Sequence, residues 1–267
     1  MEQVTSRNNA LVKRFRDMAR EGRIDDTVLL DGAHLLDEAL RSAVTLEVAA
    51  FSDEAAVRHA RLVGECERSG ARVVTLPASL ANTISPVRKG SGVVALARIT
   101  MPELETVIAT HPPQLLLVLD SVQDPGNVGA IIRTAEACGG SAVIAGAGTA
   151  DPFGWKALRG SMGSAFRLPI AAAADASIVL QKIRRARIRT FAMVPRGGVP
   201  LHRANLAAPS AILLGGEGAG LSRELTESVD EQLTIEMRSP VESLNVSVAA
   251  ALVLYEASRQ RAHVAVR

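Results

Sequence analysis

Four short, almost uninterrupted apolar runs in the second half of the chain constrain the fold more than any other feature. The runs are LLLVL at 115–119, SAVIAG at 141–146, IRTFAMV at 188–194 and AILLG at 211–215. Strands of this kind are buried on both faces, as in a parallel sheet that helices cover on either side. Helical patterns alternate with them, at 128–138, 176–187 and 246–263. The sequence therefore predicts an α/β domain built on a parallel sheet.

A second, smaller alternation precedes this domain. The expected elements are helices at 8–23, 34–41 and 54–69 and strands at 27–32, 46–52, 71–76 and 92–98, of which the last closes a small sheet. The stretch at 99–113 is interrupted by Pro102, Pro112 and Pro113 and is typical of a linker. We therefore expect two domains, at 1–105 and 106–267.

Composition excludes several classes of protein. Hydrophobic residues make up 48% and charged residues 22% of the 267 residues, which is typical of a chain that folds and not of a disordered or collagen-like one. No apolar run approaches the roughly 20 residues that cross a bilayer, so we expect a cytoplasmic protein without a membrane segment. Cys66 and Cys138 are too few for a disulfide framework, and the five histidines are scattered, so we expect no metal.

Net charge identifies no partner, because it is only +2. Two runs are locally basic, one between Arg7 and Arg23 and one between Lys182 and Arg189. Each run alone is explained more readily as a solvated helix face than as a nucleic-acid surface.

Ligands of open α/β sheets bind beyond the carboxyl ends of the strands, which directs the search to three loops. The first follows Leu119 and reads DSVQDPGNVGAIIRTA. Asn127 is well placed to cap the helix that follows the turn. Arg133 lies among apolar helix residues, where a charge is seldom tolerated without a partner.

The second and third loops follow Leu214 and precede Val246. In LLGGEGAGLSREL the glycines allow close backbone approach to a ligand, yet the pattern is neither a dinucleotide fingerprint nor a P-loop. Two roles are open for Glu217 within this loop: contact with a ligand, or ordering of the loop. In SLNVSVAAAL the polar residues Ser243 and Asn245 form an ordinary helix N-cap signature. The alanines that follow indicate close packing against this helix.

Together, and in this order, the three segments are far more specific. NVGAIIRTA, LGGEGAGLS and SLNVSVA resemble the three motifs of the SpoU (TrmH) family of RNA ribose methyltransferases, and LRGSMGSAFRLPI at 158–170 is similar to a further family stretch. The resemblance covers 113–263. The amino-terminal part, with SRNNALVK and LLDGAHLLDEAL, resembles the substrate-binding domain of the longer members, with Asp31-Gly32 where Glu-Gly is usual.

The resemblance implies a fold and an activity. The fold is a trefoil-knotted α/β methyltransferase domain after a small α/β/α RNA-binding domain. The activity is methyl transfer from S-adenosylmethionine to a ribose 2′-hydroxyl of structured RNA, by a homodimer whose partner subunit contributes to the pocket. We expect the helix at 246–263 to pack across the dimer. Large-subunit rRNA is the favoured substrate; the alternatives are tRNA, rRNA modified for antibiotic resistance, and RNA binding without catalysis.

The resemblance also implies site residues. The expected cofactor-binding residues are Gly215, Glu217, Gly218, Ile235, Met237, Leu244, Asn245 and Val246. The expected catalytic set is Asn127, Arg133, Glu217, Ser243 and Asn245. The expected RNA-binding residues are Arg7, Lys13, Arg14, Arg133 and Arg159. We interpret Arg133 as a fixed cation that stabilises the developing alkoxide, because a guanidinium does not lose its proton at neutral pH. Asn127 then orients Arg133 or the ribose, while Ser243 and Asn245 shape the pocket.

Overall fold

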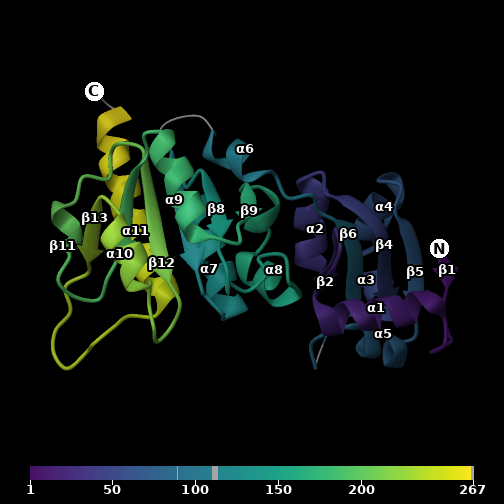
Figure 1. Cartoon of the computed structure of the whole chain (residues 1–267). Coiled ribbons are helices and arrows are strands. Elements are labelled where there is room, and N and C mark those ends of the chain that lie inside the picture. Colours follow the sequence, from purple (N-terminus) through teal and green to yellow (C-terminus); the bar gives the residue numbers. More distant parts are fainter. Residues whose placement is uncertain (89, 110–113, 266–267) are drawn as a thin grey trace. The chain divides into compact units, whose positions relative to one another are not determined.

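Two separate β-sheets organise the chain in the computed structural model, which describes residues 1–88, 90–109 and 114–265 (Figure 1). The first unit comprises Met1–Thr100 and Phe153–Phe166, and the second comprises Met101–Pro152 and Arg167–Arg267. Pro112 and Pro113 of the expected linker lie outside the described residues. The rest of that stretch holds a short helix, α6 (Leu104–Ile108), because Val107 and Ile108 are buried in the core of the second unit. The domain boundary near residue 105 stays a prediction.

The first unit has a mixed six-stranded sheet in the order β1-β5-β4-β6-β3-β2. Its strands are β1 (Glu2–Gln3), β2 (Arg23–Ile24), β3 (Thr27–Asp31), β4 (Thr45–Ser52), β5 (Arg72–Leu76) and β6 (Val93–Arg98). The strand predicted at 92–98 is β6, which joins this sheet as expected. It lies in the middle, antiparallel to both β3 and β4. Residues 93–97 are all buried, which suits a strand with a neighbour on each side.

Helices cover both faces of this sheet. Apolar residues of α1 (Ala10–Glu21) and α5 (Ala78–Ile84), among them Phe15 and Leu80, form one core with alternate strand residues. Helices α2 (Ala33–Arg41) and α4 (Ala60–Arg68) pack with each other and with the strands. The single helix expected at 54–69 is two, since the backbone leaves helical geometry at His59 between α3 (Asp53–Arg58) and α4.

The segment Phe153–Phe166 groups with the first unit although its sequence neighbours belong to the second. It contains α8 (Trp155–Ser161) and the short 3-10 helix η1 (Ser164–Phe166). Trp155 packs against the core that α1 and α5 form. The chain therefore joins the two units through three connections rather than through one linker.

The second unit is built on an all-parallel seven-stranded sheet in the order β11-β13-β10-β12-β7-β8-β9. Its strands are β7 (Leu115–Asp120), β8 (Ala142–Ala145), β9 (Ile170–Ala172), β10 (Arg189–Met193), β11 (Val199–Pro200), β12 (Ser210–Gly215) and β13 (Glu231–Thr234). The four apolar runs supply the four central neighbours, β10, β12, β7 and β8, and the predicted parallel α/β sheet is confirmed. The three missed strands are short and lie toward the edges.

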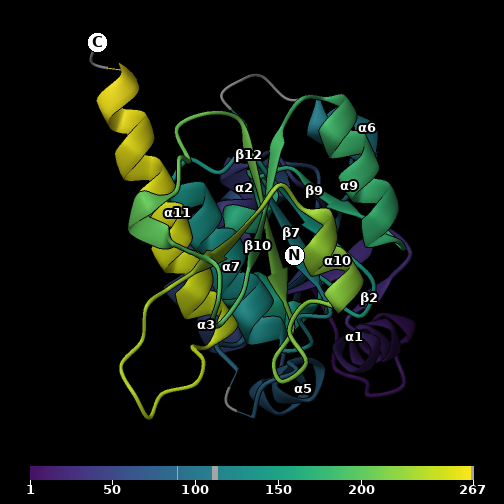
Figure 2. The same ribbon diagram turned by 60° about the vertical axis from the view of Figure 1, so that its left-hand side comes forward.

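Helices cover both faces of this sheet as well (Figure 2). On one face α6, α9 (Ala176–Arg185) and the neighbourhood of α10 (Arg223–Ser228) share a core with the strands. On the other face α7 (Pro125–Ala137) and α11 (Val246–Ala265) pack against each other. The trefoil knot that the resemblance implies stays a prediction. Among the described residues, no helix is long and apolar enough to cross a membrane.

Both cysteines are free, and only Cys66 is fully buried. Burial raises the pKa of the Cys66 thiol to about 11. This thiol is therefore protonated and unreactive at neutral pH.

An interior strand of the second sheet, β7, generates a stability prediction. Leu117 on β7 is completely buried, so Leu117→Ala removes packed atoms and leaves a cavity. We expect a loss of about 2–5 kcal/mol in the free energy of unfolding, measured by urea denaturation followed by circular dichroism. The exposed Val57 is the control, and Val57→Ala should change stability by less than about 0.5 kcal/mol. Equal effects of the two changes would contradict a core position for Leu117.

Candidate active site

A pocket of about 410 Å³ lies in the second unit at the carboxyl ends of neighbouring strands. β10 and β12 end at it, and the segment between β13 and α11 closes it. Its lining comprises Met193, Val194, Pro195, Leu214, Gly215, Gly216, Glu217, Gly218, Ala219, Gly220, Leu221, Thr226, Ile235, Met237, Ser243, Leu244, Asn245, Val246 and Ala249. All eight expected cofactor-binding residues, and the expected catalytic residue Ser243, are in this set. Their roles stay predictions.

Backbone packs directly on backbone at the floor of the pocket. Gly216 is buried and donates its N–H to the carbonyl of Asp120 at 2.9 Å, and Gly220 donates to the carbonyl of Gly216 at 3.1 Å. A Cβ at position 216 would lie 1.8 Å from the carbonyl oxygen of Ser121. No side chain fits in that space. Gly216 is thus required because two loops touch there.

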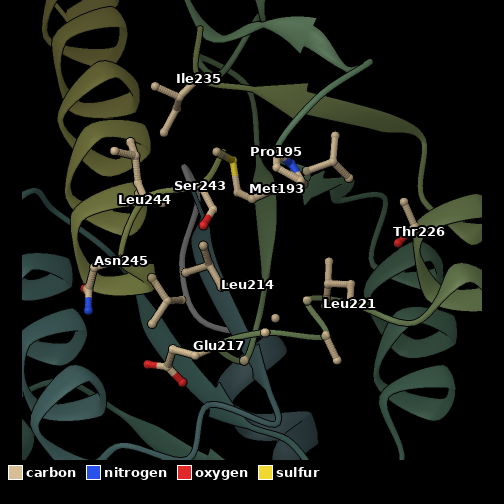
Figure 3. Close-up of a pocket in the computed structure, with 18 of the residues that line it drawn as sticks. Met193, Pro195, Leu214, Glu217, Leu221, Thr226, Ile235, Ser243, Leu244 and Asn245 are labelled. Atoms are coloured by element: carbon tan, nitrogen blue, oxygen red, sulfur yellow. The ribbon is translucent and has the colours of Figure 1, made fainter. Parts of the chain in front are cut away.

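The lining of the pocket combines apolar walls with a few polar side chains. Figure 3 shows Met193, Leu214, Ile235 and Leu244 around the pocket, with Glu217 and Asn245 toward one end and Thr226 on the opposite side. Apolar walls with a few placed polar groups are typical of sites for small organic ligands. The backbone N–H and C=O groups of the glycine-rich loop add further hydrogen-bonding positions.

A chain of side-chain hydrogen bonds joins the three predicted loops. Asn127 Nδ2 donates to Glu217 Oε1, and Asn245 Nδ2 donates to Asn127 Oδ1 at 3.2 Å. Asn245 Oδ1 accepts from the backbone N–H of Ser247 at 2.9 Å and from its hydroxyl at 2.6 Å. Asn245 therefore caps α11, as its sequence context predicted, and also fixes the amide of Asn127.

The interpretation of Asn127 as the cap of its own helix is wrong. α7 begins at Pro125, and Asp124 is the cap, with its carboxylate accepting from the backbone N–H of Asn127 at 2.8 Å. Asn127 lies inside the first turn instead. Its side chain is therefore available to link Glu217 and Asn245.

Arg133 is not brought to the pocket that these residues form. It is exposed on α7, six residues beyond Asn127, and does not line the pocket. Six residues turn a helix by about 240°, so the two side chains leave α7 in different directions. The structure thus unites four of the five expected catalytic residues and leaves the arginine on the surface.

The other expected RNA-binding residues lie in the first unit. Arg7 and Lys13 are exposed, and Arg14 pairs with Glu47, a carboxylate that Arg98 also contacts at 2.6 Å. These arginines hold the pKa of Glu47 below its usual value despite partial burial. Arg159 donates to Asp31 Oδ2 at 2.7 Å.

Sequence reasoning missed the contribution of β10. Met193, Val194 and Pro195 follow this apolar strand and line the pocket, and Leu221 and Thr226 lie beyond the glycine-rich loop. The rule that ligands bind at the carboxyl ends of parallel strands applies to β10 as much as to β7 and β12. No recognisable motif follows β10, so the sequence gives no further sign of this contribution. Among the described residues, no group of three or more His, Cys, Asp or Glu side chains is placed to hold a metal.

Comparisons with known proteins found a matching family model and several similar chains. A family model described as "SpoU rRNA Methylase family" matches residues 114–255. A 23S rRNA (guanosine(2553)-2′-O)-methyltransferase, RlmP, of Bacillus subtilis is 32% identical over 96% of this chain and 98% of its own. An AdoMet-bound rRNA methyltransferase from Sinorhizobium meliloti is 28% identical, with a TM-score of 0.85 over 97% of both chains. A structure described as an RNA 2′-O ribose methyltransferase is 31% identical, with a TM-score of 0.80 over 97% of this chain and 99% of its own.

The contact at Gly216 generates a binding prediction. Gly216→Ala forces the loop away from Ser121 and deforms the pocket. We expect the affinity for S-adenosylmethionine, the ligand of the Sinorhizobium structure, to fall roughly 100-fold or more in calorimetric titration, because each 1.4 kcal/mol or so of strain costs a factor of ten. Gly64→Ala is the matched control. A Cβ at position 64 meets nothing within 4 Å, and alanine favours the helical conformation of α4 more than glycine does. Unchanged affinity in Gly216→Ala would show that the ligand binds elsewhere.

Proposed function

Because this chain belongs to the SpoU rRNA methylase family, it is an S-adenosylmethionine-dependent RNA 2′-O-methyltransferase, and we propose that its substrate is a guanosine of 23S rRNA. The relatives support this choice of RNA. RlmP of Bacillus subtilis and an RlmB of Bordetella pertussis, the latter 32% identical over 88% of this chain, both act on a guanosine of 23S rRNA. Transfer RNA remains the second candidate substrate class, and the cytoplasmic location stays a prediction.

One observation carries the catalytic assignment. Asn127, Glu217 and Asn245 come from segments far apart in the sequence and form one hydrogen-bonded chain beside the pocket. Folding alone does not require an exposed carboxylate to accept from one amide that in turn accepts from a second. This intact chain argues against RNA binding without catalysis.

The residues of the pocket fit S-adenosylmethionine. A volume of about 410 Å³ lies within the roughly 300–1,000 Å³ of ligand pockets, and the glycine-rich loop exposes backbone groups that suit the edge of a nucleobase. Leu214, Ile235 and Leu244 provide apolar surface for a purine and for the ribose face. When bound, S-adenosylmethionine supplies a methyl group on a positively charged sulfur.

The side chains of the protein have to make a ribose hydroxyl nucleophilic. This hydroxyl is hardly ionised at neutral pH, so a group that stabilises the developing alkoxide lowers the barrier. The guanidinium of Arg133 keeps its charge and offers N–H donors both to that oxygen and to a neighbouring phosphate. We assign Asn127 and Asn245 to orienting groups in the pocket, and Ser243 to shaping its wall.

The position of Arg133 favours action across a homodimer. Arg133 lies on the surface of α7, and α7 packs against α11, which starts at the pocket. Val248, Leu252 and Tyr255 of α11 form an exposed apolar stripe at helical spacing, and the tyrosine is 67% exposed. A two-fold interface on this stripe would cover it and carry α7 of the partner subunit toward the pocket. We therefore propose that Arg133 of each protomer serves the pocket of its partner.

The substrate proposal is tested in RNA from a strain without this gene. Ribose methylation mapped across all rRNA and tRNA should lack a single 23S guanosine mark relative to the parent strain, and the purified chain should restore it with labelled S-adenosylmethionine. Loss of a tRNA mark with rRNA intact would replace the proposed substrate by the second candidate.

The role of Arg133 is tested by Arg133→Ala. We expect kcat to fall roughly 100- to 1,000-fold, the range for loss of one oxyanion-stabilising donor, while the Kd for S-adenosylmethionine stays unchanged. The measurements are single-turnover methylation and calorimetric titration. Turnover near wild type would refute the assigned role.

Mixing variants tests action across the dimer. Arg133→Ala and Gly216→Ala protomers are unfolded and refolded together in equal amounts. If Arg133 acts in the pocket of the partner, half of the dimers hold one complete site and the mixture recovers about a quarter of wild-type activity. If Arg133 acts within its own protomer, no dimer holds a complete site and the mixture stays inactive.

A further inference from the structure

A second cavity, of about 340 Å³, lies in the first unit. It is formed at the end of β3, the start of α2, the segment before β6 and the end of α8. Its lining comprises Asp31, Gly32, His34, Leu35, Val87, Ser91, Arg159 and Met162, and we call it the Arg159 cavity. None of the residues assigned to methyl transfer lines it, and Arg159 is among the expected RNA-binding residues.

A buried carboxylate holds Arg159 in place. The side chain of Asp31 is only 3% exposed; it accepts from Arg159 Nη1 at 2.7 Å and from the hydroxyl of Ser85 at 2.8 Å. Among the residues that the structure describes, Asp31 is the one acceptor within hydrogen-bonding distance of Arg159. The arginine side chain is 44% exposed, so most of its five N–H donors remain available at the cavity. An arginine fixed in this way is suited to directional binding of a phosphate.

An apolar side chain faces outward beside this arginine. Met162 is 41% exposed and adopts a left-handed backbone conformation, with a φ of +52°, at the end of α8. This conformation is costly for any residue but glycine, by about 1 kcal/mol or more. A methionine there adds strain and exposed apolar surface, and neither is needed to end a helix. Its thioether and the exposed imidazole of His34 offer surfaces on which an unstacked base can lie.

We propose that the Arg159 cavity binds one unstacked nucleotide of the RNA substrate, with a phosphate on Arg159 and the base against Met162 and His34. The inference rests on the proposed function and deepens it by placing an RNA contact in the first unit. The volume suits a single small ligand. The charge of Arg159 is balanced by Asp31, so recognition depends on aligned N–H donors and stacking more than on net charge.

The left-handed backbone of Met162 allows a test of the proposed nucleotide site. Met162→Gly removes the side chain and relieves the left-handed strain, so it separates a binding role from a structural one. We expect the full-length protein to bind a 23S rRNA fragment that it methylates roughly tenfold more weakly, the range for loss of one stacked base, by fluorescence anisotropy. The unfolding temperature should not fall below the wild-type value, because the strain is relieved, and the Kd for S-adenosylmethionine should stay unchanged. Ala43→Gly is the matched control. Ala43 also has a positive φ, of +54°, but it follows the carboxyl end of α2, whereas the cavity lies at the start of that helix.

Further measurements decide between the remaining outcomes. Arg159→Lys keeps the charge but loses the planar fork, and it should also weaken RNA binding. Unchanged RNA affinity in both Met162→Gly and Arg159→Lys overturns the proposal. Weaker RNA binding also overturns it if Ala43→Gly shows the same loss, or if the unfolding temperature of the variant falls as well. Guanosine monophosphate and inorganic phosphate are titrated in parallel. If the mononucleotide binds as tightly as the RNA and Met162→Gly abolishes that binding, the cavity is a free-nucleotide site.

The wild-type protein separates this proposal from the proposed function. Methylation of the fragment by wild type, together with unchanged RNA affinity in the variants, rejects the cavity alone. Failure of wild type to bind or methylate any rRNA fragment rejects both.

Discussion

The contact between the backbones of Gly216 and Ser121 sets the form of the active site. The loop after β12 lies so close to the loop after β7 that a Cβ at position 216 would overlap a carbonyl oxygen. Parallel strands place these two loops at the same edge of the sheet, and the absence of a side chain allows them to touch. Because they touch, Glu217 comes within reach of Asn127, and the pocket opens beside a fixed glycine-rich wall.

Hydrogen bonding then joins the third segment to the first two. Asn245 caps α11 with its oxygen and donates to Asn127 with its nitrogen, so the start of the last helix and the orientation of a site residue depend on one amide. The hydrogen-bonded side chains and the apolar walls of the pocket have different roles. We assign the walls to a nucleoside-like cofactor and the hydrogen-bonded side chains to the groups that react. Arg133 lies outside this arrangement on the surface of α7, which is why we propose that it acts in a neighbouring subunit.

We assign the two units to different parts of the proposed reaction. The second unit holds the pocket that we assign to the methyl donor, and the first holds an arginine that a buried aspartate orients. Asp31 stands where the resemblance to the longer family members leads us to expect glutamate. Its shorter side chain is nevertheless buried and paired with Arg159, a residue 128 positions further along the chain. A substitution that looks conservative in the sequence is thus one half of a specific ion pair.

Local patterns of the sequence determined the central strands, the long helices and the loops that carry the site, because burial on both faces and helical periodicity leave direct traces in residue order. The motifs indicated Gly215, Glu217 and Asn245 as neighbours of a ligand. The sequence did not reveal that β6 lies inside its sheet, that Met193 and Pro195 line the pocket, or that Asp124 rather than Asn127 caps α7. Those features depend on which strands pair and on which side chains have a partner within reach. Only the tertiary structure decides them, since such contacts join residues that residue order alone does not bring together.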